Sequence, residues 1–129
     1  MIVDSSAIVA VMLDEPEADS FDALIMGALS RKIAAPTLLE LTLVLTGRFG
    51  PEALKGLDEY LAKTGIITIP FTADHAAVAR QAFLRYGKGR HPAGLNFGDC
   101  ISYAAARLEA MPLLFKGDDF RKTDVECAA

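Results

Sequence analysis

Four acidic side chains, far apart in the chain, have the chemistry of a metal-assisted hydrolase. Asp4 and Asp118 each come at or just after the end of a short apolar run. Asp99 stands at the start of a predicted helix, and Glu40 lies inside another. Carboxylates that converge repel one another and cannot all ionise unaided, whereas Mg²⁺ or Mn²⁺ relieves the repulsion because hard cations prefer carboxylate oxygens and water. Such ions activate water and orient a phosphodiester, so the four acids indicate phosphodiester hydrolysis.

Glu40 has the strongest physical case for a functional role. Its predicted helix, residues 37–48, is apolar nearly all round, and the residues three and four positions on are Leu43 and Val44. An ionised carboxylate beside a core is costly unless it meets a cation, a metal or several donors. Arg48 lies two turns away and offers no pairing. The sequence therefore predicts a partner for Glu40 from elsewhere in the fold.

The other acids also suit structural roles, and the sequence leaves both readings open. Asp4 is a good helix N-cap, because its carboxylate accepts a backbone N–H. With Asn96 as N-cap, Asp99 occupies the third helical position of a capping box. Asp118 follows a glycine in a segment that suits a turn. Its neighbour Asp119 could equally be the fourth acid.

Competing chemistries lack their motifs. His75 and His91 have no partner at zinc-binding spacing, and there is no GxGxxG, GxxxxGK[ST] or GxSxG sequence. Cys100 is most simply a small buried residue. A phosphatase that uses Asp4 as nucleophile would carry a second acid two positions on, where this chain has Ser6.

The charge distribution qualifies an otherwise acidic composition. The net charge of −4 argues against a nucleic-acid ligand, since phosphate binders usually carry excess Lys and Arg. No acidic residue falls between Asp74 and Asp99, however, and this stretch is basic. It is either a solvated helix face that runs into a basic loop or a phosphate-facing patch. The basic side chains are Arg80, Arg85, Lys88, Arg90 and His91.

Short apolar runs alternate with segments of helical periodicity along the whole chain. Strands separated by helices require crossover connections, which predict a parallel sheet between helical layers. In such sheets the functional crevice lies beyond the carboxyl ends of the strands, where Asp4 and Asp118 fall. The expected strands cover residues 1–3, 32–35, 66–69 and 113–115, and the expected helices 7–13, 17–29, 36–49, 52–63, 74–86 and 96–109.

Bulk properties predict one domain, residues 1–129, in a reducing cytoplasm. A length of 129 residues suits a single domain, and 52% hydrophobic residues supply a core. No apolar run reaches the roughly 18 to 20 residues of a membrane helix, and residues 1–4 lack a basic n-region. Cys100 and Cys127 form no disulfide framework.

With these residues in view, the chain resembles PIN-domain ribonuclease toxins of the VapC family. The resemblance spans nearly the whole chain in the family's order. Each motif is weak alone, whereas the ordered set is specific. The segments that carry it are Met1–Ala7, Ala35–Glu40, Tyr86–His91, Leu95–Cys100, Leu114–Phe120 and Thr123–Val125.

The resemblance implies an α/β fold, a PIN-like three-layer sandwich with a central, mostly parallel sheet of four to five strands flanked by helices. It implies an endoribonuclease that depends on Mg²⁺ or Mn²⁺, with Asp4 and Asp99 as the principal metal ligands. Glu40 and Asp118 would complete the catalytic acids, through water or a second ion. Ser6 would orient Asp4 or the substrate.

The resemblance also implies partners: an RNA substrate guided by the basic stretch, a cognate VapB-type antitoxin, and a second copy in a homodimer. Neither a membrane nor DNA alone is an expected partner. A different class, a non-catalytic PIN-like module that binds RNA or a protein, would keep the fold and lose the metal dependence.

Overall fold

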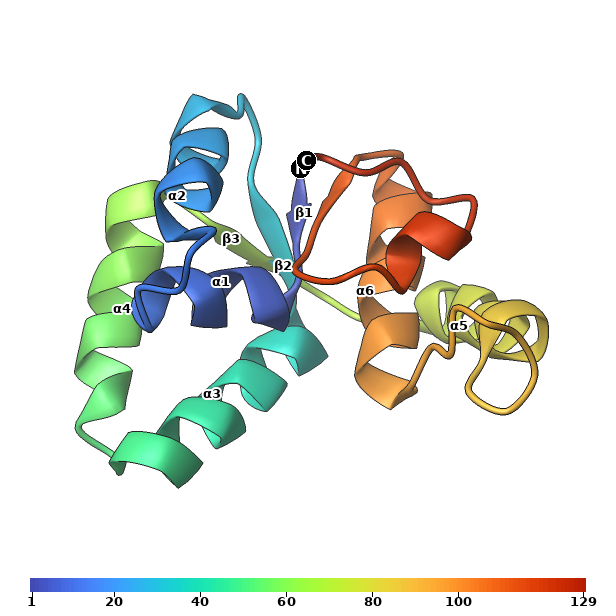
Figure 1. Ribbon diagram of the computed structural model, residues 1–129, viewed down its shortest axis with the longest axis horizontal. Coiled ribbons are helices and arrows are strands. Elements are labelled where there is room, and N and C mark those ends of the chain that lie inside the picture. The colour runs from blue at the N-terminus through green and yellow to red at the C-terminus, as the bar shows by residue number, and fades with distance from the viewer.

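The computed structural model describes residues 1–129 as four short strands and six α-helices, followed by one turn of 3₁₀ helix (Figure 1). The strands are two or three residues long, so most of the framework is helical. The strands are β1 (Ile2–Val3), β2 (Lys32–Ala34), β3 (Ile67–Ile69) and β4 (Leu113–Leu114). The helices are α1 (Ser5–Met12), α2 (Ala18–Gly27), α3 (Ala35–Phe49), α4 (Ala53–Thr64), α5 (Ala73–Tyr86), α6 (Phe97–Glu109) and the 3₁₀ turn η1 (Phe120–Lys122).

The strands form one sheet in the order β3-β2-β1-β4, and every pairing is parallel. Ile2 of β1 lies opposite Lys32 of β2 on one side and Leu113 of β4 on the other. The expected α/β architecture with a parallel sheet is therefore confirmed. One further parallel bridge joins Leu113 to Cys127, so the four strands and their three pairings are extended by the start of a fourth pairing.

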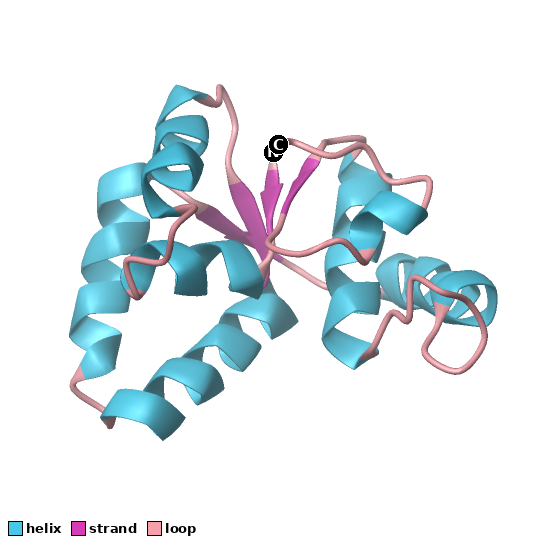
Figure 2. Ribbon diagram, viewed as in Figure 1, coloured by secondary structure: helices cyan, strands magenta, loops and turns pink.

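The sheet separates two hydrophobic cores, because successive side chains of a strand point to opposite faces. Ile2 and Leu113 belong to the core beneath α5 and α6, whereas Val3 and Leu114 belong to the core beneath α1 to α4. Figure 2 shows the helices gathered on the two sides of the strands. The chain is thus a three-layer sandwich.

Two local details differ from the expectations. Helix α1 begins at Ser5, two residues before the expected start, and its N-cap is Asp4. Helix α2 ends at Gly27, so Leu29 is not helical and is fully exposed. The guanidinium of Arg31 donates to the carbonyl oxygens of Met26 and Ala28, at 3.0 and 3.1 Å, and so satisfies the end of the helix.

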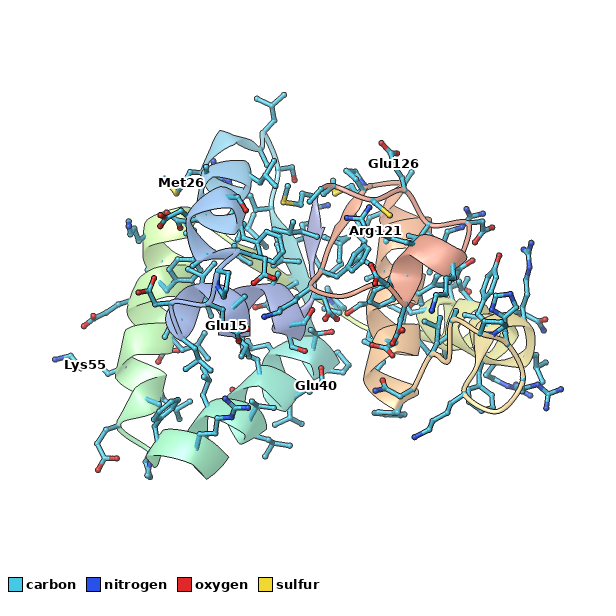
Figure 3. The ribbon with its side chains drawn as sticks, in the orientation of Figure 1. Glu15, Met26, Glu40, Lys55, Arg121 and Glu126 are labelled. Carbon is cyan, nitrogen blue, oxygen red and sulfur yellow. The ribbon has the colours of Figure 1, made fainter.

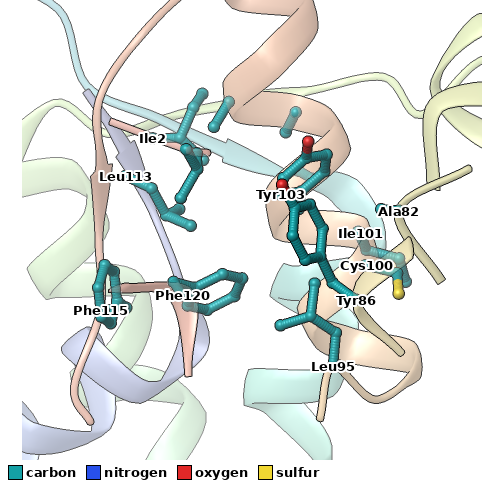
Figure 4. Close-up of a cluster of buried hydrophobic side chains, with 14 of the residues drawn as sticks. Ile2, Ala82, Tyr86, Leu95, Cys100, Ile101, Tyr103, Leu113, Phe115 and Phe120 are labelled. Atoms are coloured by element: carbon teal, nitrogen blue, oxygen red, sulfur yellow. The ribbon is translucent and has the colours of Figure 1, made fainter. Parts of the chain in front are cut away.

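The segment after β4 is held at several points. Phe115 and Phe120 pack with ring centroids 4.9 Å apart (Figure 4). The hydroxyl of Tyr103 donates to Asp124 at 2.6 Å, and this hydrogen bond, with nearby guanidinium groups, lowers the pKa of Asp124. The ion-pair partners of Asp124 are Arg85 and Arg107. These contacts position the loop that carries Asp118.

None of the helices combines the length and the apolar composition that crossing a bilayer requires.

Candidate active site

The carboxyl ends of the strands meet at one edge of the sheet, and three of the four predicted acids, Asp4, Glu40 and Asp99, gather there. The backbone N–H of Asp4 donates to the carbonyl of Leu114 at 2.9 Å, so the ends of β1 and β4 are in register. Helix α3 follows β2 without a loop and carries Glu40 near this edge (Figure 3). The first turn of α6 brings Asp99 to the same place.

Asp4 is 4% exposed, and both of its carboxylate oxygens accept hydrogen bonds. Oδ2 accepts from the backbone N–H of Ser6 at 3.0 Å and from the Ser6 hydroxyl at 2.6 Å. Oδ1 accepts from the hydroxyl of Ser102 at 2.5 Å. Asp4 is thus an N-cap, as one reading of the sequence held, and it is also a fixed carboxylate at the edge of the acidic cluster.

Glu40 is half-buried and has partners from two other segments. Its Oε1 accepts from the hydroxyl of Ser5 at 2.7 Å. Its carboxylate also lies against Gly98, so closely that a β-carbon at that position would overlap it. Glu40 forms no ion pair. One hydroxyl donor does little to offset the burial of a charge, so the carboxylate remains an unneutralised group.

Asp99 is both a capping residue and a perturbed acid. It forms the capping box with Asn96: its Oδ2 accepts from the Asn96 N–H at 3.0 Å, and its own N–H donates to Asn96 Oδ1 at 2.9 Å. Burial, and after it the charges of Asp4, Asp119 and Glu40, raise the pKa of Asp99 to about 6, against the lowering effect of the Asn96 hydrogen bond. Three other carboxylates therefore act electrostatically on this one group.

The two terminal acids differ in their relation to the cluster. Asp118 and Asp119 are both exposed, and both lie in the turn that leads into η1. Only Asp119 contributes to the raised pKa of Asp99. The structure therefore brings Asp4, Glu40 and Asp99 together and adds Asp119 electrostatically; no such contribution comes from Asp118.

The residues present fit a hydrated hard cation. No ion pair neutralises any of the clustered acids, although Lys116 lies nearby in sequence and pairs with Glu15 and Glu17. No three acidic, histidine or cysteine side chains stand close enough to bind one ion directly. Mg²⁺ usually keeps several waters and takes only one or two protein carboxylates. The donor set, all carboxylate oxygens without a cation, matches that mode of binding.

The basic stretch is exposed, and part of it is already engaged. Arg85 pairs with Asp124 at 3.5 Å, and the Arg90 Nε donates to the carbonyl of Leu84 at 3.1 Å. Arg80 and Lys88 form no ion pair. Arg80 borders an apolar groove of about 500 Å³ over α5 and α6, whose aromatic walls are Phe71, Phe83 and Phe97.

Three residues near the acids were not predicted from the sequence: Gly98, Ser102 and Thr37. Ser102 stands three positions after Asp99, a spacing that places both on neighbouring parts of one helix face. That spacing was an available signal. Nothing in the local sequence marks Gly98 or Thr37, because their role depends on how α3 packs against α6.

The comparisons with known proteins agree along the whole chain. The PIN domain model matches residues 1–126. The chain is 50% identical to Ribonuclease VapC36 of Mycobacterium tuberculosis over 98% of this chain and 91% of that protein. It is 43% identical to Ribonuclease VapC30 of the same species over 100% of this chain and 98% of that one.

Among solved structures, M. tuberculosis VapC20, described as a Sarcin-Ricin loop cleaving toxin, superposes with a TM-score of 0.77 at 18% identity. The match covers 96% of this chain and 95% of that one. VapBC2 from Rickettsia felis, bound to a DNA fragment from its promoter, gives a TM-score of 0.76 at 14% identity, with 98% and 95% covered. The fold, the family model and the close relatives agree, and the chain belongs to the PIN-domain family, in its VapC group.

Proposed function

We propose that this protein is the toxin of a VapBC-type toxin–antitoxin pair and hydrolyses RNA phosphodiester bonds with the help of Mg²⁺ or Mn²⁺. The observation that carries the proposal is the cluster of carboxylates without a neutralising cation, in which burial first, and then the charges of neighbouring acids, raise the pKa of Asp99 to about 6. A carboxylate cluster that disfavours its own ionisation is suited to a cation. Relatives named VapC ribonucleases support the reaction class.

The proposed division of labour follows from the contacts of each acid. Asp4 and Asp99 would hold the metal. Asp4 is fixed by three hydrogen bonds, and the pKa of Asp99 is raised by burial and by the charges of the other acids. Glu40 has one oxygen, Oε2, that accepts no hydrogen bond from the protein, so it is available to orient a water molecule. When bound, the cation lowers the pKa of water and offsets the phosphodiester charge. Arg80 and Lys88 are exposed cations that attract the RNA backbone.

The fourth acid of the proposed site is Asp119 rather than Asp118. Asp119→Asn is expected to weaken Mn²⁺ binding and to lower the pKa of Asp99, because it removes one of the charges that raise it. Asp118→Asn, the matched control one residue away, is expected to leave both unchanged. Calorimetry with Mn²⁺ and an NMR titration of the Asp99 carboxyl measure the two effects. If Asp118→Asn, and not Asp119→Asn, weakens Mn²⁺ binding and lowers the pKa of Asp99, the fourth acid is Asp118.

Expression without an antitoxin tests the proposed activity directly. The wild type is expected to arrest growth and, when purified, to cleave RNA only with Mg²⁺ or Mn²⁺. Asp4→Asn is expected to reduce cleavage by at least about 100-fold, because it removes a charge that would face the metal. Growth assays and RNA cleavage with and without EDTA provide the readouts. Cleavage that persists without divalent ions contradicts the mechanism, and a protein without cleavage or Mn²⁺ binding is the non-catalytic module.

Protein partners are proposed on the strength of exposed apolar surface. Leu39, Leu43 and Phe49 of α3 are exposed, and a second apolar surface is the groove over α5 and α6. Such surfaces often mark protein interfaces. Similar folds include a toxin–antitoxin complex from Klebsiella pneumoniae, with a TM-score of 0.70. A VapB-type antitoxin and a second copy of this chain are the proposed partners, and light scattering with and without co-expressed antitoxin tests both.

A further inference from the structure

Two buried hydroxyl groups, one in contact with the other, connect Asp4 to the interior of the fold. Ser102 of α6 is 0% exposed and donates to Asp4 Oδ1 at 2.5 Å. Thr37 of α3 is 2% exposed, and its Oγ1 lies 3.5 Å from Ser102 Oγ. Buried hydroxyls are costly unless they are paired, and here their only side-chain partners are each other and Asp4.

The direction of these hydrogen bonds follows from counting protons. A serine hydroxyl has one proton, and an ionised carboxylate can only accept. The Ser102 proton therefore goes to Asp4, and Thr37 must donate to Ser102. A donor that itself receives a hydrogen bond is polarised and binds its acceptor more strongly. Any effect of Thr37 on Asp4 would therefore pass through Ser102, across the long 3.5 Å contact between the two hydroxyls.

The other carboxylate oxygen of Asp4, Oδ2, also accepts from a hydroxyl that has a partner of its own. The backbone N–H of Lys116 donates to Ser6 Oγ at 3.0 Å, and the Ser6 hydroxyl donates to Asp4 Oδ2 at 2.6 Å. Each oxygen of Asp4 is therefore held by a hydroxyl that is itself held by another segment. A carboxylate held at both oxygens is restrained about its terminal torsion. Oδ2 already accepts two hydrogen bonds and Oδ1 one, which leaves a lone pair of Oδ1 for another partner.

We propose that Ser102 and Thr37 are positioning residues that fix the carboxylate of Asp4 for divalent-cation binding. The inference rests on the proposed function. Capping alone does not require them, because Ser6 N–H already supplies the N-cap hydrogen bond of α1. Core packing alone does not require hydroxyl groups either, since alanine and valine would fill these buried places without a polar atom. The hydroxyls are explained by what they do to Asp4.

Calorimetric Mn²⁺ binding to matched variants tests the proposal. Loss of a hydrogen-bond partner behind a metal ligand typically costs about 10- to 100-fold in affinity, so Ser102→Ala is expected to bind Mn²⁺ at least about 10-fold more weakly. Thr37→Val keeps the shape and removes the hydroxyl, and a smaller loss of affinity is expected. Thr37→Ser keeps the hydroxyl and is expected to bind like the wild type.

A double-mutant cycle tests whether Thr37 acts on Asp4 through Ser102, which we call the relay, or whether the two residues act independently. If Thr37 acts through Ser102, adding Thr37→Val to Ser102→Ala is expected to cause no further loss of Mn²⁺ affinity. Additive losses overturn the relay. If circular dichroism shows that Ser102→Ala does not fold, the comparison of Thr37→Val with Thr37→Ser tests the proposal instead. An unchanged Mn²⁺ affinity in Thr37→Val then overturns it.

A readout without metal distinguishes this inference from the proposed function. The Ser102 proton, buried in a 2.5 Å hydrogen bond, is expected to give a slowly exchanging, downfield hydroxyl resonance that Ser102→Ala removes. Absence of that resonance in the wild type overturns the relay. A wild type that binds no Mn²⁺ contradicts the proposed function, whereas equal binding by the wild type and Ser102→Ala contradicts the relay alone.

Discussion

Asp99→Asn is expected to abolish RNA cleavage and yet to raise the melting temperature of the metal-free protein at neutral pH. The aspartate is a proposed metal ligand, and its pKa is raised to about 6 by burial and by the charges of Asp4, Asp119 and Glu40. Ionised Asp99 therefore lowers the free energy of unfolding of the protein when no cation is present. Asparagine keeps a side-chain oxygen for the Asn96 N–H of the capping box, so the helix start is retained.

The pH dependence of the Asp99→Asn effect has a definite sign. Between the ordinary aspartate pKa of 3.8 and the folded-state pKa of about 6, the unfolded chain binds fewer protons than the native state. The Asp99 contribution to stability therefore falls as the pH rises through this window and stays low above it. The gain from asparagine should be absent near pH 4 and complete above pH 7. Because Asp99 is partly exposed, we expect a gain of about 1 kcal/mol, or roughly 4 °C.

Thermal unfolding in EDTA at several pH values measures this gain. Asp58→Asn, which removes an exposed acid on α4, is the matched control and should change the melting temperature little. Added Mn²⁺ should stabilise the wild type and leave Asp99→Asn unaffected, because only a form that binds the ion gains from it. A lower melting temperature of Asp99→Asn at neutral pH would contradict this expectation. It would show that the capping-box hydrogen bonds of the aspartate stabilise the fold by more than its burial and charge repulsion destabilise it.

Gly98→Ala is expected to reduce cleavage by at least about 10-fold while leaving the fold intact. A β-carbon at this position would overlap the Glu40 carboxylate. That carboxylate is the end of a flexible side chain, so it can move away, and its hydrogen bond from Ser5 would be lost. Alanine favours helix more than glycine by about 1 kcal/mol, which offsets the strain. The expected result is a stable protein with a displaced Glu40 carboxylate.

Gly47→Ala provides the control for Gly98→Ala. Gly47 lies in α3, and a β-carbon there would meet nothing within 4 Å. This variant should gain helix stability and keep full cleavage. Melting temperatures and cleavage rates of both variants, compared with Glu40→Gln, make the test. Full activity in Gly98→Ala would mean that cleavage does not depend on where the Glu40 carboxylate lies.

The acidic site was predictable from the sequence to different degrees. The positions of Asp4 after the first strand and Asp99 at a helix start follow from local patterns, and both residues lie there. The apolar surroundings of Glu40 predicted a partner from another segment, and Ser5 supplies the one hydrogen bond it accepts. The metal ligation of these acids remains a prediction. The choice between Asp118 and Asp119 did not follow from the sequence, because both follow the same strand.

The sequence by itself determined the order of strands and helices, the parallel sheet and the edge at which the acids had to collect. These features follow from periodicity, caps and turns, which act over a few residues. Only the tertiary structure decided that Ser102 holds Asp4 from 98 residues away, that Gly98 admits the Glu40 carboxylate, and that Asp119 acts on Asp99. Hydrogen bonds and charge–charge effects change over fractions of an ångström to a few ångströms, and such distances arise from packing between segments.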